Sequence, residues 1–217
     1  MTVDQATVRL PLSRDRIVSA AVELADDQGI EALSMRKLGQ ALGVEAMSLY
    51  NHVEDKDDIL SGMVDWLFAQ IGPLDDTADW KVAVRHVAVR AKDVFTAHAW
   101  TLPLISAQGI AGPAAFGLMD SVLARLLGAG YPTHLVLHAW HVIASHVMGY
   151  SFQETTSVWA SDEALDRKKR ALLEGYADRF PHVSALAEEL MACSFVEEFE
   201  FGLDIILSGI EAARDTT

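Results

Sequence analysis

Apolar side chains recur at spacings of three and four residues from residue 17 to residue 210, which predicts a chain built from helices. A first helix opens at Leu12 and Ser13, ends at Gly29 and carries the apolar set Ile17, Ala21, Leu24 and Ala25. Ser34 can cap a second helix that stops at Gly43, with Leu33 and Leu38 at the spacing of a hydrophobic staple. The next segment, residues 45–51, is too short for a stable isolated helix, so neighbouring helices must hold it.

A fourth helix is predicted after Asp55, which can cap it. Its wide apolar face ends at Gly72 and Pro73 and consists of Ile59, Leu60, Met63, Val64, Leu67, Phe68 and Ile71. Residues 72–79 contain turn-forming and acidic residues that cannot extend this face, so we expect a domain boundary there.

The remainder of the chain also predicts helices. An amphipathic helix covers residues 80–95, shorter ones follow at 102–108 and 118–127, and residues 133–152 are apolar on nearly all faces, as in a central buried helix. Residues 153–166 predict a loop. Ser194 and Glu197 have the spacing of a capping box that opens a last helix. With no strand pattern, we predict an all-α fold: a three-helix helix-turn-helix domain over residues 1–72 and a larger helical domain over residues 73–217.

Residues 33–56 carry the pattern most closely tied to function. Two short helices joined by Gly43 and Val44 lead into the cluster Leu49-Tyr50-Asn51-His52. This arrangement is typical of a helix-turn-helix, whose second helix enters the major groove of DNA. Spacing alone leaves a second interpretation open, because the same geometry occurs in proteins that never meet nucleic acid.

Composition indicates the cellular compartment and the strength of binding to random DNA. The single cysteine, Cys193, cannot form an intrachain disulfide, and the first residues lack the apolar run of a signal peptide, so we expect a cytoplasmic protein. No uncharged membrane span is expected, because histidines interrupt the apolar residues 135–152. The net charge of −14 predicts weak, salt-sensitive affinity for random DNA, with Arg36, Lys37 and Lys56 offering local cations.

Residues 13–71 resemble the N-terminal domain of the TetR family of bacterial transcriptional regulators, through the runs LSMRKLGQALGV and SLYNHVEDKDDIL. The run FEFGLDIIL, residues 199–207, resembles the last helix of the tetracycline-repressor branch, which pairs with the long preceding helix across a two-fold axis. The resemblance implies a homodimeric repressor that leaves double-stranded operator DNA when a small molecule binds its C-terminal domain. It implies no cofactor.

The resemblance also implies where DNA is contacted: Met35, Arg36, Ala46, Met47, Ser48, Tyr50, Asn51, His52 and Lys56. Arg36 can fork onto a base edge or a phosphate, whereas the hydroxyl, imidazole and ammonium groups of this set suit phosphate oxygens. Ala46 and Met47 replace a glutamine and a proline of the tetracycline-repressor branch, and Asn51 replaces an aromatic residue. We therefore expect a different operator, with apolar contact to a thymine methyl as one substitute.

Two further sets follow from the resemblance. The helices that enclose the ligand in this family carry the candidate pocket residues Phe95, His98, Trp100, Phe116, Met119, Trp140 and His141, for which a filled core is the alternative. The acidic partner of a magnesium-drug chelate is not recognisable around residues 153–157, so tetracycline is not the expected ligand. A four-helix dimer interface is expected from residues 135–150 and 195–212, including Leu135, Val142, Phe195, Phe199, Gly202, Leu203, Ile206 and Ile210.

Three histidines leave an alternative open. His134, His138 and His141 fall on one helical face, a pattern that also fits a metal-responsive or pH-responsive regulator, or a metal-dependent enzyme. No cysteine or acid stands nearby at matching spacing, so we assign no metal site. We expect no catalysis, because the chain lacks a glycine-rich phosphate loop and Cys193 lies in no recognisable motif.

Overall fold

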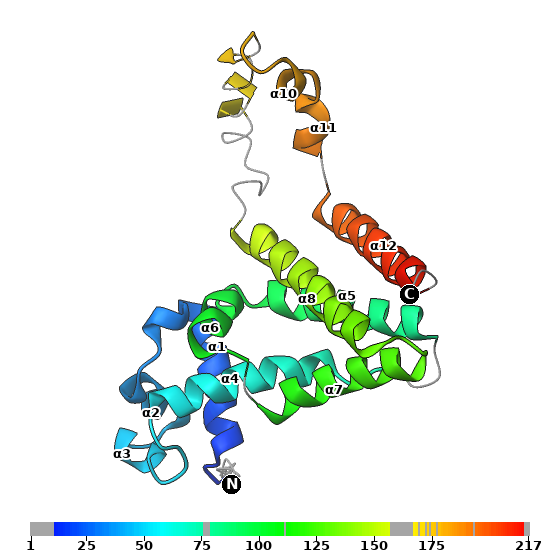
Figure 1. Cartoon of the computed structure of the whole chain (residues 1–217). Helices are drawn as coiled ribbons and strands as arrows, with labels where there is room; N and C mark the ends of the chain where they lie inside the picture. Colours follow the sequence, from blue (N-terminus) through cyan, green and yellow to red (C-terminus); the bar gives the residue numbers. More distant parts are fainter. Residues whose placement is uncertain are drawn as a thin grey trace, which may run out of the picture. The chain divides into compact units, whose positions relative to one another are not determined.

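The computed structural model describes residues 11–75, 79–110, 112–156, 167–168, 170–171, 173, 175–176, 178–192 and 194–214. Every regular element within these residues is helical, which confirms the predicted all-α fold (Figure 1). The chain forms two compact units: Met1–Gln70 with His98–Phe116, and Ile71–Ala97 with Gly117–Thr217. The segment His98–Phe116, which the sequence-based division assigned to the second domain, thus groups with the first unit.

The first unit contains α1 (Arg14–Gln28), the 3-10 turn η1 (Ile30–Ala32), α2 (Met35–Leu42), α3 (Ala46–Leu49), most of α4 (Lys56–Ile71) and α6 (Thr101–Gln108). The predicted caps are present. The hydroxyls of Ser13 and Ser34 each accept a backbone N–H three residues on at 3.3 Å. Gly29 and Gly43 end α1 and α2 with φ of 80° and 68°, which glycine adopts without the steric cost of a Cβ.

Four helices of the first unit bury apolar side chains. Fully buried side chains come from α1, α2, α3 and α4: Ile17, Leu38, Leu49, Ile59, Met63 and Leu67. Leu33, the predicted staple residue before α2, is also buried. Burying each of these side chains contributes about 1.5–3 kcal/mol, so the four helices stabilise one another although α3 has only four residues.

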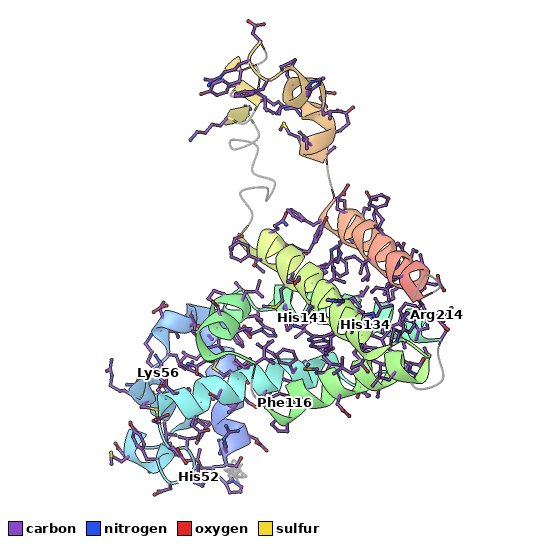
Figure 2. All side chains as sticks on the ribbon, viewed as in Figure 1. His52, Lys56, Phe116, His134, His141 and Arg214 are labelled. Atoms are coloured by element: carbon purple, nitrogen blue, oxygen red, sulfur yellow. The ribbon has the colours of Figure 1, made fainter. Side chains whose placement is uncertain are left out.

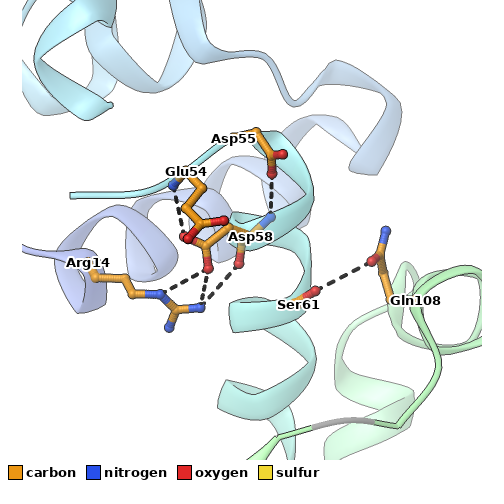
Figure 3. A network of polar contacts seen from close by, with 6 residues as sticks. All are labelled: Arg14, Glu54, Asp55, Asp58, Ser61 and Gln108. Carbon is orange, nitrogen blue, oxygen red and sulfur yellow. Dashed lines mark hydrogen bonds and ion pairs between the residues drawn. The ribbon is translucent and has the colours of Figure 1, made fainter. Parts of the chain in front are cut away.

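A polar network fixes the start of α4 against α1 (Figure 3). The guanidinium of Arg14 donates to Asp58 Oδ1 at 2.7 Å from Nη2 and 3.2 Å from Nε. Asp58 Oδ2 accepts the Glu54 N–H at 3.1 Å, and Asp55 Oδ1 accepts the Asp58 N–H at 2.9 Å, which is the cap predicted for Asp55. The Arg14 hydrogen bonds lower the pKa of Asp58 below its usual 3.8, an effect that partial burial opposes and the Glu54 N–H reinforces.

The second unit contains α5 (Trp80–Ala97), most of α7 (Pro113–Gly128), α8 (Thr133–Thr156), α10 (Pro181–Ala185), α11 (Ala187–Ala192) and α12 (Phe195–Arg214). α8 packs against both α5 and α12, and Phe199, Leu203 and Leu207 of α12 are fully buried. Ion pairs from Lys81 to Glu211, at 2.9 Å, and from Arg85 to Asp204 join α5 to α12.

Helix α8 differs from its prediction in two ways. It is not buried on nearly all faces, because Leu137, Val142 and Phe152 are about half exposed. The loop predicted from residue 153 is wrong for its first four residues, since α8 continues to Thr156. Hydroxyls of Thr155 and Thr156 bond carbonyls four residues back, at 2.8 and 2.5 Å, which gives both hydroxyls a partner within the helix. Residues 157–166 lie outside the described part of the chain.

Asp58→Asn should destabilise the protein by about 1 kcal/mol at pH 7, because the charge on Asp58 is paired with Arg14 near the surface. A lowered folded-state pKa stabilises above the unfolded value of 3.8, and this stability is lost as pH falls through the folded pKa. The difference between variant and wild type should therefore shrink below pH 4, as urea unfolding at a series of pH values can measure. Asp57→Asn, in the same helical turn, is the matched control. A difference that stays constant down to pH 3 would contradict this assignment.

Candidate functional site

The turn between α2 and α3 brings the two helices close together. Gly43 adopts a left-handed conformation, and the Val44 N–H donates to the Gly39 carbonyl at 2.9 Å. A Cβ on Gly39 would lie 2.9 Å from the Val44 carbonyl oxygen and 3.1 Å from the Ala46 nitrogen. The absence of a side chain at Gly39 therefore permits this close approach, and α3 begins directly after the turn.

Helix α3 is a single turn whose stability comes from its surroundings. Its N-cap residue, Glu45, makes no side-chain capping bond. The Leu49 carbonyl accepts N–H groups of His52 at 2.9 Å and Val53 at 3.1 Å, so the helical turn leads into a hydrogen-bonded loop. Leu49 and Val53 are buried, which fixes one face of α3 to the core and leaves the opposite face to solvent.

The predicted DNA-contacting residues lie mostly on this outer surface, and we call α3 and its flanking residues 35–36 and 50–56 the recognition surface. Met47 is 75% exposed and Tyr50 46% exposed, although both carry large apolar groups. Six of the nine predicted residues are exposed and three are half-buried, the latter being Met35, Ala46 and Ser48. His52 and Lys56 project from the turn after α3 and from the start of α4 (Figure 2).

The recognition surface includes two cations, Arg36 and Lys56. Among the described residues, no hydrogen bond or ion pair engages the side chains of Arg36 and Lys56, so both are available to an external anion. Lys37, by contrast, donates to Gln28 Oε1 at 2.7 Å. Two uncommitted cations beside exposed Met47 and Tyr50 form a surface that can pair with phosphates and touch base edges.

The predicted pocket residues are divided between the two units. His98, Trp100 and Phe116 fall in the first, whereas Phe95, Met119, Trp140 and His141 fall in the second. Phe116 is 59% exposed, and His141 is exposed with its Nδ1 2.7 Å from the Leu137 carbonyl. His98 and Trp100 contact the carboxylate of Asp26 on α1, a partner that the sequence did not predict.

The predicted dimer residues also separate into two groups. Phe199 and Leu203 are fully buried within their own chain, and a Cβ on Gly202 would meet the His146 ring at 2.5 Å, so this face of α12 packs on α8. An apolar groove of about 260 Å³ lies between α8 and α12 and is lined by Leu135, His138, Ala139, Val142, Ile205, Ile206, Gly209, Ile210 and Ala213. Phe195, another predicted residue, is half-buried.

Further exposed apolar residues lie within the predicted interface ranges 135–150 and 195–212, although the prediction does not single them out. Phe201 is 65% exposed, Ile205 58% and Leu137 44%. The signal was present, because α12 is apolar on two faces, but the pattern could not show which face its own chain covers.

The histidine face of α8 is exposed. His134 and His138 rings lie 6.5 Å apart, and His141 is engaged with a backbone carbonyl as described above. No group of three histidine, cysteine or acidic side chains in the described residues is arranged to hold a metal ion.

No single helix among the described residues has the length and apolarity needed to cross a membrane. α6 and α7 reach that length and composition only when the bent pair is counted together.

Comparison with known proteins gives a family match for most of the chain. The chain matches the model for bacterial regulatory proteins of the tetR family over residues 17–63 and that for the tetracyclin repressor-like C-terminal domain over residues 72–214. It is 34% identical to an HTH-type transcriptional regulator of Saccharopolyspora erythraea, over 96% of this chain and 88% of the relative. It is 30% identical to the HTH-type transcriptional repressor DrrR1 of Streptomyces coeruleorubidus, over 92% and 77%.

Solved structures give the same assignment. Apo ActR from Streptomyces coelicolor superposes with a TM-score of 0.82 at 25% identity, covering 95% of this chain and 98% of that one. ActR in complex with actinorhodin also gives 0.82, at 25% identity and over 94% and 99%. The relatives are regulators of transcription, which supports the expectation that the chain is not an enzyme and gives no support to the metal-dependent alternatives. The chain belongs to the TetR family of bacterial transcriptional regulators and binds DNA through its helix-turn-helix.

Proposed function

We propose that this protein is a homodimeric repressor that binds double-stranded operator DNA and leaves it when a small-molecule effector binds. Residues 1–72 provide DNA binding, residues 73–217 provide effector binding and dimerisation, and the protein acts in the cytoplasm. The observation that carries the proposal is the recognition surface, a one-turn helix anchored by buried Leu49 that exposes Met47 and Tyr50 beside two uncommitted cations.

Each exposed group of the recognition surface has a matching partner on a DNA duplex. Lys56 and the Tyr50 hydroxyl can donate to phosphate oxygens, which fix the position of the protein but carry no sequence information. Arg36 can make a bidentate contact to guanine, and the Met47 side chain can pack on a thymine methyl. With Ala46 unable to hydrogen-bond through its side chain, Met47 is the residue of α3 best placed to influence base preference.

Release by an effector is supported by the relatives. DrrR1 is a repressor by name, and ActR has been solved with actinorhodin and with (S)-DNPA. In a two-fold dimer, two α3 helices enter successive major grooves only when they are about 34 Å apart. An effector that binds more tightly to a dimer with another spacing shifts the population away from DNA, by no more than its differential affinity for the two states.

The groove between α8 and α12 is the proposed dimer interface. Ile205 and Val142, which line the groove, expose apolar area that an identical surface of a second copy can cover, and two-fold symmetry requires such a self-complementary face. Interfaces of this kind are held by a few central apolar residues.

The proposed effector site uses the predicted pocket residues of the second unit, with Phe95 buried and Met119 and Trp140 half-buried. Side chains of this apolar and aromatic kind would favour an apolar or aromatic effector. His141 is proposed to supply one polar contact.

Substitutions on the recognition surface should distinguish residues that contact phosphates from residues that determine base preference. Lys56→Ala should weaken binding to the operator and to mismatched duplexes by the same factor, and should lower the slope of log affinity against log salt by about 0.9. Tyr50→Ala should likewise weaken both. Met47→Ala should change the preferred bases, as selection from a random duplex pool can measure. Lys168→Ala removes an exposed charge from the second unit and is the control. Unchanged binding by all three variants would remove the DNA-binding assignment.

Charges placed in the groove should separate the dimer without damaging the core of a protomer. Ile205→Asp and Val142→Asp should each raise the dimer dissociation constant by about 30-fold or more, as expected for a central interface residue. Sedimentation equilibrium measures the constant, and circular dichroism checks the fold. Val82→Asp changes a similarly exposed valine on α5 and should leave the dimer intact. Wild-type dimerisation in both groove variants would place the interface elsewhere.

Effector binding should stabilise the protein by about 2.7 kcal/mol at a ligand concentration one hundred times the dissociation constant. A thermal-shift screen of apolar and aromatic compounds should give hits whose shift is reduced by Trp140→Ala. His141→Ala should reduce it only for compounds with a polar atom to match. Phe152→Ala, exposed on the same helix, is the control. Compounds whose thermal shift is unchanged in both Trp140→Ala and Met119→Ala would refute this pocket.

A further inference from the structure

One carboxylate oxygen on α1 contacts two ring nitrogens, whose residues lie more than seventy positions further along the chain. Asp26 Oδ1 lies 2.7 Å from His98 Nδ1 and accepts the Trp100 indole N–H at 2.6 Å. The Trp100 side chain is buried, and the His98 ring packs edge-on against Trp66 of α4 with centroids 5.4 Å apart. Because a carboxylate only accepts, Nδ1 of His98 carries the proton in this contact.

The other end of the same segment is held by a second carboxylate. Asp65 Oδ1, on α4, accepts the Ala114 N–H at 2.8 Å, at the start of α7. A Cβ on Gly112 would lie 2.3 Å from this oxygen, so only glycine permits the contact. Between the two ends, Ser61 Oγ on α4 lies 3.5 Å from Gln108 Oε1 of α6 (Figure 3). We call residues 98–114, all described except residue 111, the coupling segment.

The helices that hold the coupling segment also hold the recognition surface. Arg14 and Asp58 tie α1 to α4, and a Cβ on Gly62 of α4 would lie 2.7 Å from a Val18 methyl of α1. Buried Leu49 anchors α3, which packs against α2, and α2 packs against α1. A shift of α1 would therefore reach α3 through α2.

We propose that Asp26 is a positioning residue that links the coupling segment to operator binding. In the state in which the recognition surface fits DNA, Asp26 is paired with His98 and Trp100. The proposal rests on the proposed function, in which effector and operator favour different states. The contacts of Asp26 are between side chains, so they can separate without breaking any helix. Trp100 and His98 share one acceptor, so loss of Asp26 releases both together.

Coupling of this kind is reciprocal, which allows a test without a known effector. If pairing at Asp26 favours DNA binding, then DNA binding favours the pairing and orders the coupling segment. Amide hydrogen exchange of the full-length chain should be measured with and without a saturating duplex selected from a random pool by the wild-type protein. Exchange of wild-type amides in residues 98–110 should slow by about fivefold or more on DNA binding, the lower range of allosteric coupling.

The variants distinguish coupling from a merely structural role. Asp26→Ala should abolish this slowing while amides around α3 still slow, which shows that DNA is bound. Asp26→Asn keeps an acceptor for Trp100 without the charge and should retain part of the slowing, which also covers any failure of the alanine variant to fold. Asp27→Ala removes the neighbouring exposed carboxylate and should behave as wild type. A structural role alone would speed exchange in the free protein and leave the DNA-induced difference intact.

Three results would overturn the proposal: no slowing in the wild-type coupling segment, full slowing in Asp26→Ala, or equal loss in Asp27→Ala. Failure of the proposed function has a different signature. In that case the wild-type chain selects no duplex, and amides around α3 do not respond to any DNA.

Discussion

Burial of Leu49 is the contact on which the DNA-binding surface depends. A helix of four residues cannot pay its nucleation cost in water, so α3 persists only because its neighbours fix it. Leu49 is wholly buried, α3 packs against α2, and buried Val53 closes the following turn. The same anchoring leaves Met47 and Tyr50 exposed on the opposite face, so one apolar contact both stabilises α3 and orients its outer surface.

The acidic composition of the chain is compatible with DNA binding because several acids near the recognition surface are already engaged. Asp58 is held by Arg14 and by the Glu54 N–H, and Asp55 caps α4. Elsewhere in the first unit, Asp26 accepts from Trp100 and contacts His98. Arg36 and Lys56 keep their charges uncommitted within the described residues. The net charge of −14 therefore limits attraction to random DNA without removing the local cations that a specific site requires.

Local features of the fold were predictable from the sequence. Ser13, Ser34, Gly29 and Gly43 mark the ends of α1 and α2, because capping depends on residues within one turn of a helix end. The recognition surface followed from spacing together with a family resemblance. The predicted domain boundary at residues 72–73 rests on local turn-forming residues. Such residues do not indicate with which unit the segment His98–Phe116 packs.

Features that depend on distant residues were not predictable. Nothing in the spacing of α12 distinguishes Phe199, which its own chain buries, from Phe201, which it leaves 65% exposed. The pairing of Asp26 with His98 and Trp100 joins residues 72 and 74 positions apart, and a single sequence contains no signal for it. The last turn of α8 falls in the predicted loop because Thr155 and Thr156 are poor helix formers by propensity, although in the helix their hydroxyls bond backbone carbonyls four residues back.

The most direct test of the account is the symmetry of the DNA that the wild-type protein selects from a random duplex pool. Two copies of α3 related by a two-fold axis predict an inverted repeat whose half-sites have centres about one helical turn, or ~34 Å, apart. Footprinting of the selected duplex should protect two successive major grooves on one face. Enrichment of a single asymmetric half-site, or of no sequence at all, would contradict a homodimeric repressor that binds through the recognition surface.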